Sequence, residues 1–284
     1  MPVLRIFLRL PAARRKRLVR PGHADRLVVD VSFDRCSEQF DKRPGLPPPL
    51  FEELLDRLVD QLGGNGPVLD LGAGTGRFAI PLQARGIRVV EVDISHAMLR
   101  RARMKGARDV CVANAMRLPF RDRTFETTLT VSILHLVASW RGALHEVARV
   151  TRNRLVNVSE SSRLYRLPRK DGSEEPYDPL GRYLEIAGPP WREYTHPGHH
   201  WVDLAERIVP PKTRITIGPR RQVVDGDWLL SLIEARAYSP QWPVPDPVHA
   251  AALERLRIEM AIRQFEQISE VEIVSWTSDE LRSM

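Results

Sequence analysis

The sequence predicts an α/β fold, a doubly wound sheet with helices between its strands. Three observations predict it. Residues 68–71 form an apolar strand pattern that runs directly into a glycine turn at residues 72–76, and a second apolar stretch, residues 87–93, ends in a carboxylate. Helical periodicity of apolar residues follows at residues 97–102 and 140–151. The length of 284 residues and the hydrophobic content of 43% suit one such domain with additions.

The glycine turn follows the pattern D-x-G-x-G-x-G, from Asp70 through Gly72 and Gly74 to Gly76. Glycines at alternate positions remove every Cβ atom from one side of a tight strand-to-helix turn, so a ligand can lie against the backbone. The dinucleotide pattern G-x-G-x-x-G needs a glycine where Arg77 stands, so the turn does not match an NAD site. Glycines also serve purely steric roles in turns, and the triplet alone leaves that alternative open.

Asp93 is the predicted ribose ligand. It ends the second predicted strand, and a carboxylate at that strand end can accept two hydrogen bonds from a ribose diol. Ile94 follows as an apolar surface for adenine, and Ser95 caps the next helix. The alternative role for Asp93 is that of an ordinary helix-start residue.

From about Phe33 to Ser159 the sequence resembles the class I S-adenosylmethionine-dependent methyltransferases, and among them the type 11 small-molecule members. In that family the D-x-G-x-G-x-G turn passes under the amino-acid end of the cofactor. The resemblance implies S-adenosyl-L-methionine as the cofactor, methyl transfer as the activity, and a Rossmann-like sheet of seven strands with an antiparallel strand seven and a helical cap. The cofactor residues that it implies are Asp70, Gly72, Gly74, Gly76, Asp93, Ile94, Asn114 and Ala115.

Asn114 is a departure from the family pattern. Residues 110–120 form a strand that breaks into a proline-bearing turn, and they resemble the family's G-D-A-x-x-L-P-F segment. In the family, the acid of that segment accepts a hydrogen bond from the adenine amino group. Asn114 occupies its place, and we expect its amide oxygen to accept the same bond without the charge, although Ala113 replaces the glycine. Ala115 is assigned to adenine with it.

Three further residues are candidates for the acceptor side. Residues 124–135 resemble the family's fourth strand, which ends beside the methyl group, and His135 stands at its end as a candidate general base. A packing histidine is the alternative. The segment 33–44 resembles the part of the family that often covers the cofactor; Phe40 is a lid candidate, and Arg43 is a candidate partner of the cofactor carboxylate or a surface residue.

The predicted organisation has four parts: a basic tail at residues 1–24, the cofactor core at 25–160, a substrate-side insertion at 161–200 without regular period, and residues 201–284. In the last part we expect strands six and seven at 213–217 and 271–276, and cap helices at 228–237 and 248–268; strand five is expected at 155–158. His196, His199 and His200 match no ligand spacing, so we expect no metal site.

The charge distribution ranks the possible functions, and the cysteine content indicates the compartment. The net charge is +7, and seven basic residues before Asp25, with no acid among them, account for all of it. The remaining chain is neutral, so an RNA methyltransferase is the second choice, and a cofactor-binding protein without activity is the third. Residues 1–20 are a flexible extension or a weak membrane-surface segment. Cys36 and Cys111 form no disulfide framework, which favours a cytoplasmic location. We therefore expect a methyltransferase for a small or lipid-like acceptor.

Overall fold

The computed structural model describes residues 34, 37–41, 46–64, 66–168, 172–189, 201–260 and 263–284, without the side chains of 38, 39, 160–164 and 239. The predicted basic tail, Arg43, Cys36 and the three histidines at 196, 199 and 200 lie outside the described residues. Among the described residues, no helix has the length and apolar character needed to cross a membrane.

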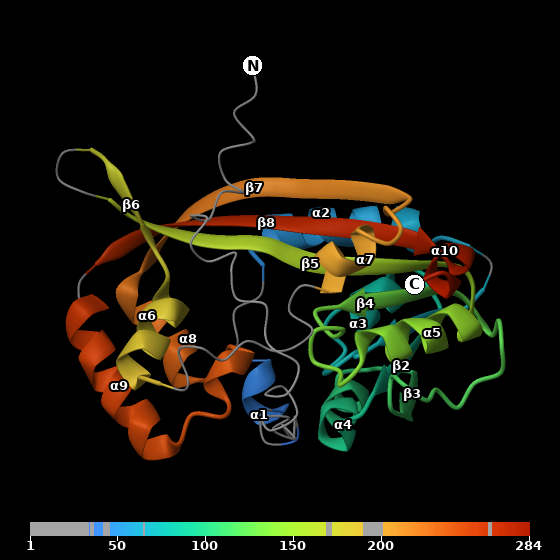
Figure 1. Ribbon diagram of the computed structural model, residues 1–284, viewed down its shortest axis with the longest axis horizontal. Helices are drawn as coiled ribbons and strands as arrows, with labels where there is room; N and C mark the ends of the chain where they lie inside the picture. Colours follow the sequence, from blue (N-terminus) through green and yellow to red (C-terminus); the bar gives the residue numbers. More distant parts are fainter. Residues whose placement is uncertain are drawn as a thin grey trace. The chain divides into compact units, whose positions relative to one another are not determined.

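One mixed sheet organises the described chain (Figure 1). Its strands are β1 (Val68–Leu71), β2 (Val89–Asp93), β3 (Asp109–Val112), β4 (Phe125–Val131), β5 (Thr151–Pro168), β6 (Glu174–Tyr177), β7 (Thr213–Asp225) and β8 (Gln264–Thr277). The spatial order is β3-β2-β1-β4-β5-β8-β7, with β6 attached to β5. Strands β1 to β5 pair with one another in parallel, whereas β8 is antiparallel to both β5 and β7, and β6 is antiparallel to β5. The predicted doubly wound sheet with an antiparallel last strand is confirmed, and β6 is an addition to the seven strands expected.

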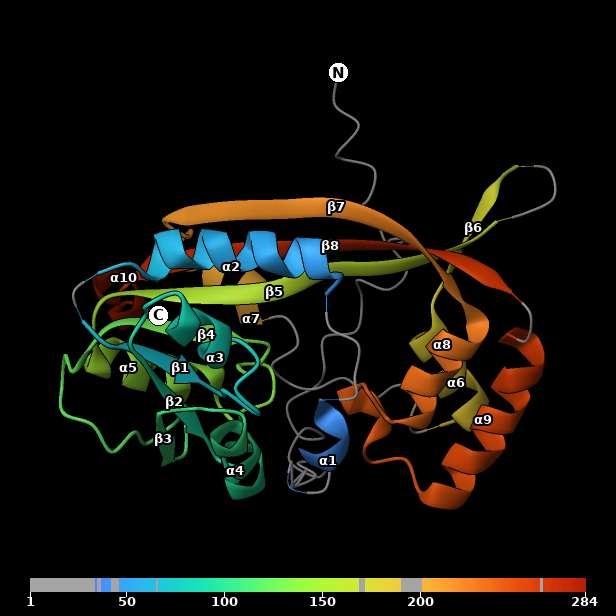
Figure 2. The ribbon, with the colours of Figure 1, turned by 180° about the vertical axis from the view of Figure 1, so that it is seen from behind.

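Helices cover both faces of this sheet (Figure 2). The helices of the described chain are α1 (Ser37–Phe40), α2 (Pro48–Leu62), α3 (Ala79–Ala84), α4 (His96–Met104), α5 (Trp140–Val150), α6 (Pro179–Ala187), α7 (Trp201–Glu206), α8 (Gly226–Glu234), α9 (Asp246–Met260) and α10 (Ser278–Arg282). One apolar cluster packs α2 and α3 against the sheet, and another packs α5, α7 and α10 against it. The helices thus sandwich the strands whose carboxyl ends carry the predicted site.

Helices α2 and α5 show why apolar periodicity and helix-start residues predict helices in this sequence. In α2 the buried residues Leu50, Leu54 and Leu58 recur every fourth position, and proline stands in its first turn, where no backbone donor is needed. In α5 the side chain of Ser139 accepts a hydrogen bond from the Gly142 N–H and so begins the helix. Leu144 is among the apolar residues of α5 that face the core.

The strands of the second half are longer than predicted. β5 runs over 18 residues rather than over 155–158, and β7 and β8 likewise extend past 213–217 and 271–276. The predicted helix over 248–268 is wrong beyond Met260, because β8 begins at Gln264. The extension of β7 is mostly exposed, and ion pairs such as Arg221–Glu266 join it to β8, so apolar periodicity does not mark it.

The expected helical cap is present at the far end of the long strands. Helices α6, α8 and α9 share an apolar cluster with Tyr165 of β5 and Phe265 of β8. Within the cap, the buried Tyr183 hydroxyl forms a hydrogen bond of 2.7 Å with Nδ1 of His249. The last pairing of β4 with β5 joins Val131 to Val158, so β5 continues beyond the end of β4. That direction is the carboxyl edge of the parallel strands, where the glycine turn also lies.

Candidate cofactor site

The glycine turn leaves β1 and adopts a left-handed backbone at each glycine. Gly72, Gly74 and Gly76 have φ angles of +77°, +59° and +79°, a region that side chains disfavour. The N–H groups of Gly72 and Ala73 both donate to the carbonyl of Val92, at 2.7 Å and 3.0 Å. The turn is therefore fastened to the end of β2, next to Asp93.

The three glycines are needed for different reasons. A Cβ atom on Gly72 would lie 2.5 Å from Ile133, and one on Gly76 would lie 2.9 Å from Ile80, so both positions are filled by packing. Among the described residues, the atom nearest to a Cβ atom on Gly74 would belong to the Phe40 ring, at 3.8 Å. Gly74 is thus the position of the turn at which the backbone is open to a ligand.

Asp93 lies directly beside that open backbone. Its Oδ2 accepts a hydrogen bond of 2.9 Å from the Gly74 N–H, and its Oδ1 accepts one of 2.8 Å from the Ser95 N–H. Burial raises the pKa of Asp93, and the N–H groups of Ser95 and Gly74 oppose that rise. Each carboxylate oxygen has a further lone pair, so the group can still receive hydroxyl donors. The turn and the predicted ribose ligand therefore form one unit.

Asp70 lies in β1, beneath the unit that the glycine turn and Asp93 form, and is not part of that unit. Its side chain is buried, and burial together with the nearby Glu91 and Asp93 raises its pKa well above the usual value. Glu91 is also fully buried, and burial raises its pKa to about 7. We did not predict Glu91 as a site residue; the available signal was a charged residue inside an otherwise apolar strand.

The segment of residues 34–41 is fastened on both sides of the turn. Asp34 Oδ1 accepts a hydrogen bond of 2.5 Å from the Ser95 hydroxyl, which together with the Ala97 N–H lowers the pKa of Asp34. Asp41 accepts a 2.5 Å hydrogen bond from the fully buried Thr75. Phe40 lies between these two attachments, with its ring close to Gly74.

Residues at the end of β3 complete the edge. Val112 pairs with Asp93 across the strands, and Val112 and Ile94 have exposed fractions of 50% and 61%. Such exposure of two apolar side chains at a strand edge suits a flat apolar ligand group. The side-chain Oδ1 of Asn114 accepts a 2.8 Å hydrogen bond from the Met116 N–H. One lone pair of that oxygen is left for adenine, and the adjacent amide nitrogen only donates. Ala115 follows Asn114 in the same turn.

His135 lies in the loop that follows β4, two residues beyond Ile133, which packs on Gly72. The loop leaves the strand through Ser132, whose φ is +52°, and buries Leu134. His135 itself is half-buried. The structure therefore brings the end of β4 to the glycine turn, as the resemblance implied for the fourth strand.

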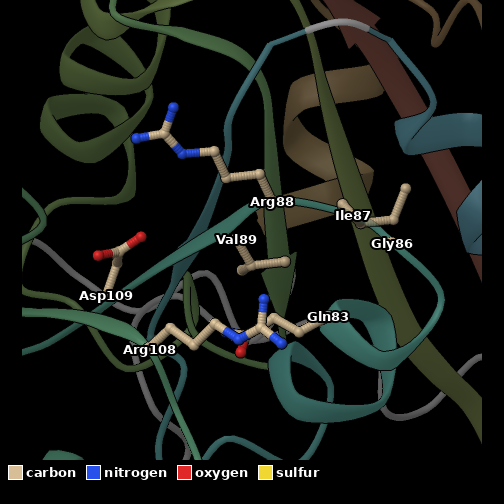
Figure 3. A pocket seen from close by; sticks show the side chains of 7 residues that line it. All are labelled: Gln83, Gly86, Ile87, Arg88, Val89, Arg108 and Asp109. Carbon is tan, nitrogen blue, oxygen red and sulfur yellow. The ribbon is translucent and has the colours of Figure 1, made fainter.

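A pocket of about 370 Å³ lies elsewhere on the sheet (Figure 3). Its lining comes from the amino ends of β2 and β3 and from Gln83, whereas the glycine turn stands at the carboxyl ends. The side chains of Arg88 and Arg108 extend in different directions, so they do not converge on one ligand group (Figure 3). In the described part of the chain, no three His, Cys, Asp or Glu side chains are grouped to hold a metal ion.

Comparison with known proteins agrees with this geometry. Residues 69–154 match the family model described as a methyltransferase domain. A malonyl-[acyl-carrier protein] O-methyltransferase of Halorhodospira halophila is 36% identical over 46% of this chain and 48% of its own length. A phosphatidylethanolamine N-methyltransferase of Cereibacter sphaeroides is 34% identical over 44% of this chain and 58% of its own length. The chain thus spans about half the length of these relatives.

A solved structure extends the likeness to the fold. An Anabaena variabilis protein, described as a methyltransferase from an antibiotic biosynthesis pathway, matches 78% of this chain and 96% of its own, with a TM-score of 0.54 and 15% identity. Residues 69–154, which contain the glycine turn and strands β2 to β4, thus match a methyltransferase domain in sequence, and the sheet around them matches the fold of a solved structure.

Proposed function

We propose that this protein transfers a methyl group from S-adenosylmethionine to a small or lipid-like acceptor. The observation that carries the proposal is the pairing of Gly74 with Asp93: a backbone open to a ligand beside a carboxylate with unused acceptor positions. A nucleoside with an amino-acid tail needs both features, one for its tail and one for its ribose. The family match of residues 69–154 supports the same cofactor.

Different residues of the site would bind different parts of the cofactor. The backbone from Gly72 to Gly76 would hold the amino-acid end, with Asp70 in the layer below, and Asp93 would accept the ribose hydroxyls. Ile94 and Val112 would flank the adenine, which Asn114 and Ala115 would contact at its edge.

The cofactor supplies a methyl group that a positively charged sulfur already activates. The protein therefore has to align the acceptor and exclude water, and good alignment alone lowers a barrier by as much as ~7 to 11 kcal/mol. Phe40 is placed to exclude water because its ring stands next to the open glycine. For an acceptor that must lose a proton, His135 is the residue that we propose as general base, since its loop follows β4 at the same edge.

The nature of the acceptor is inferred from relatives and from charge. The two relatives named above are a methyltransferase of malonyl-[acyl-carrier protein] and one of phosphatidylethanolamine, that is, of a malonyl group on a carrier protein and of a lipid. Outside its first residues the chain has no excess of basic residues, which disfavours RNA. We propose residues 25–160 for cofactor binding and the later residues, with the cap, for the acceptor. A reducing, cytoplasmic compartment fits the free Cys111.

Calorimetric titration of the full chain tests the cofactor assignment. S-adenosylhomocysteine should bind, NAD should not, and Asp93→Ala should weaken binding about 100-fold, because it removes charge-assisted hydrogen bonds. Asp122→Ala is the matched control: this exposed carboxylate pairs with Arg149. Thermal melting confirms that each variant is folded. Absence of S-adenosylhomocysteine binding by the folded wild type would refute the proposal.

Methyl transfer then tests the acceptor class. The full chain and isotopically labelled S-adenosylmethionine are incubated separately with quinols, short carboxylic acids, phospholipid vesicles and total RNA. Label should enter one of the first three classes. Label in RNA alone would overturn the acceptor class while leaving the cofactor assignment in place. The variant His135→Asn should lower the rate without changing S-adenosylhomocysteine affinity.

A further inference from the structure

Three carboxylates lie on one face of the sheet beneath the glycine turn. Asp70 of β1 is the register partner of Glu91 in β2, and partners in parallel strands point to the same side. Asp93 stands two residues after Glu91 and so shares that face. The electrostatic influence of Glu91 and Asp93 on the pKa of Asp70 agrees with this closeness.

Glu91 is the member of this group that has a carboxylate oxygen without a hydrogen bond from the described residues. Its side chain has no exposed surface, and its Oε1 accepts a long hydrogen bond of 3.3 Å from Gln83. Among the described residues, its Oε2 has no hydrogen-bond partner. That same oxygen lies 3.0 Å from the place that a Cβ atom on Gly76 would take. The carboxylate is therefore aimed at the turn from below.

The charges around Glu91 leave a surplus of acid. Asp70 and Asp93 face it from the strands, and α3 contributes only the neutral Gln83. Lys105, just after α4, is the cation that lowers the Glu91 pKa, but its Nζ is already bound to Asp41 at 2.8 Å. A buried carboxylate with so little compensation is stabilised by any positive charge added nearby.

We propose that ionised Glu91 makes the cofactor site selective for charge, so that it binds the cationic S-adenosylmethionine in preference to the product, whose sulfur is neutral. The proposal rests on the proposed function, because it assigns a role within that cofactor site. Substrate and product differ by one methyl group and one positive charge. A carboxylate behind the turn acts on the charge without touching the methyl group, and it assists product release.

Affinity ratios test this role without an activity measurement. The dissociation constants of S-adenosylmethionine and S-adenosylhomocysteine are measured by calorimetry at pH 6 and pH 8 for the wild type, Glu91→Gln and Glu254→Gln. Glu254 is a matched control because it lies exposed on the cap, where it pairs with Arg257. The amino groups of both ligands titrate alike in every variant, so the difference between variants at one pH isolates Glu91.

At pH 8 the preference for S-adenosylmethionine should fall about five-fold in Glu91→Gln, the size expected for one charge acting through a partly buried site. Glu254→Gln should match the wild type at both pH values, and the effect of Glu91→Gln should shrink at pH 6, where Glu91 is protonated. An unchanged ratio in Glu91→Gln at pH 8 would overturn the proposal. Failure of both ligands to bind the wild type would instead refute the cofactor assignment.

A second variant keeps the test decisive if Glu91→Gln does not fold. Gln83→Leu leaves Glu91 in place but removes a hydrogen bond that lowers its pKa. The pH at which the preference for S-adenosylmethionine appears should then move upward. Identical pH profiles for Gln83→Leu and the wild type would contradict the role of Glu91.

Discussion

The hydroxyl of Thr75, inside the glycine turn, donates a 2.5 Å hydrogen bond to Asp41, which lies 34 residues earlier in the chain. Asp41 also binds Lys105. The bond therefore holds the segment that carries Phe40 against the turn. In Thr75→Val this attachment is lost at nearly constant volume, and we expect S-adenosylhomocysteine to bind about five-fold more weakly. Calorimetry measures the change.

Two further substitutions sharpen this prediction. Thr75→Ser keeps the hydroxyl and should restore most of the affinity. Thr124→Val removes another threonine hydroxyl, which donates to the Arg121 carbonyl before β4, and should have no effect on binding. Equal affinities for Thr75→Val and the wild type would show that the attachment of Asp41 does not contribute to the site.

Alanine substitutions at Gly74 and Gly86 separate two effects: backbone strain at a positive φ and steric obstruction of the ligand. Both have a positive φ, +59° and +88°, and a Cβ atom on either would clash with none of the residues that the structure describes. Alanine at either position should therefore cost about 1 kcal/mol of unfolding free energy. Only Gly74→Ala should also reduce S-adenosylhomocysteine affinity, by more than about ten-fold, because its methyl group would occupy the ligand side of the turn. Comparable affinities in the two variants would place the ligand elsewhere.

Asn114 limits the recognition of adenine. Its amide oxygen already accepts the Met116 N–H, so one atom would have to serve two donors. Asn114→Asp supplies a second, charged acceptor while the first keeps its bond to Met116. We expect S-adenosylhomocysteine to bind about five-fold more tightly to the variant. The gain should vanish for S-inosylhomocysteine, whose base carries an oxygen in place of the amino group. An equal gain for both ligands would argue against contact at that edge.

Glu91 should make the ligand-free protein less stable as the pH rises. On folding, the pKa of Glu91 rises from 4.5 to about 7, so the folded state holds this proton more tightly than the unfolded state. The stabilising contribution is complete below pH 4.5 and is lost as the pH rises through about 7. Between pH 5 and pH 8 the free energy of unfolding should therefore fall by about 2 kcal/mol more in the wild type than in Glu91→Gln. Urea unfolding at both pH values measures this; parallel curves for the two proteins would contradict it.

The first half of the fold could be predicted because its signals are local. The strand before the turn is apolar except for Asp70, which opens the glycine motif, and β2 ends in the predicted ribose ligand, Asp93. The outer part of β7 could not, since it is mostly exposed and pairs with β8 through polar and charged residues. Arg221, for example, forms an ion pair with Glu266, and nothing in the spacing of these residues indicates a strand.

The same distinction applies to the candidate site. The places of Gly74 and Asp93 follow from a short motif and from the alignment of parallel strand ends. The attachments of Asp34 to Ser95 and of Asp41 to Thr75 join residues 61 and 34 positions apart. Hydrogen bonds between residues so far apart form only when the chain folds, so no local sequence pattern predicts them. Glu91 was visible as an acid in an apolar strand, but its lack of partners was not.

The position of β8 sets an order for the assembly of the sheet. This strand, Gln264–Thr277, lies between β5 and β7, which precede it in the chain. Until β8 has left the ribosome, the long edge of β5 and all of β7 lack this partner, while β1 to β4 can already pair. The nascent protein thus carries open strand edges until β8 is available, which favours interaction with chaperones or with other copies. A substitution that weakens β8 should therefore reduce the yield of soluble protein more than the stability of what has folded.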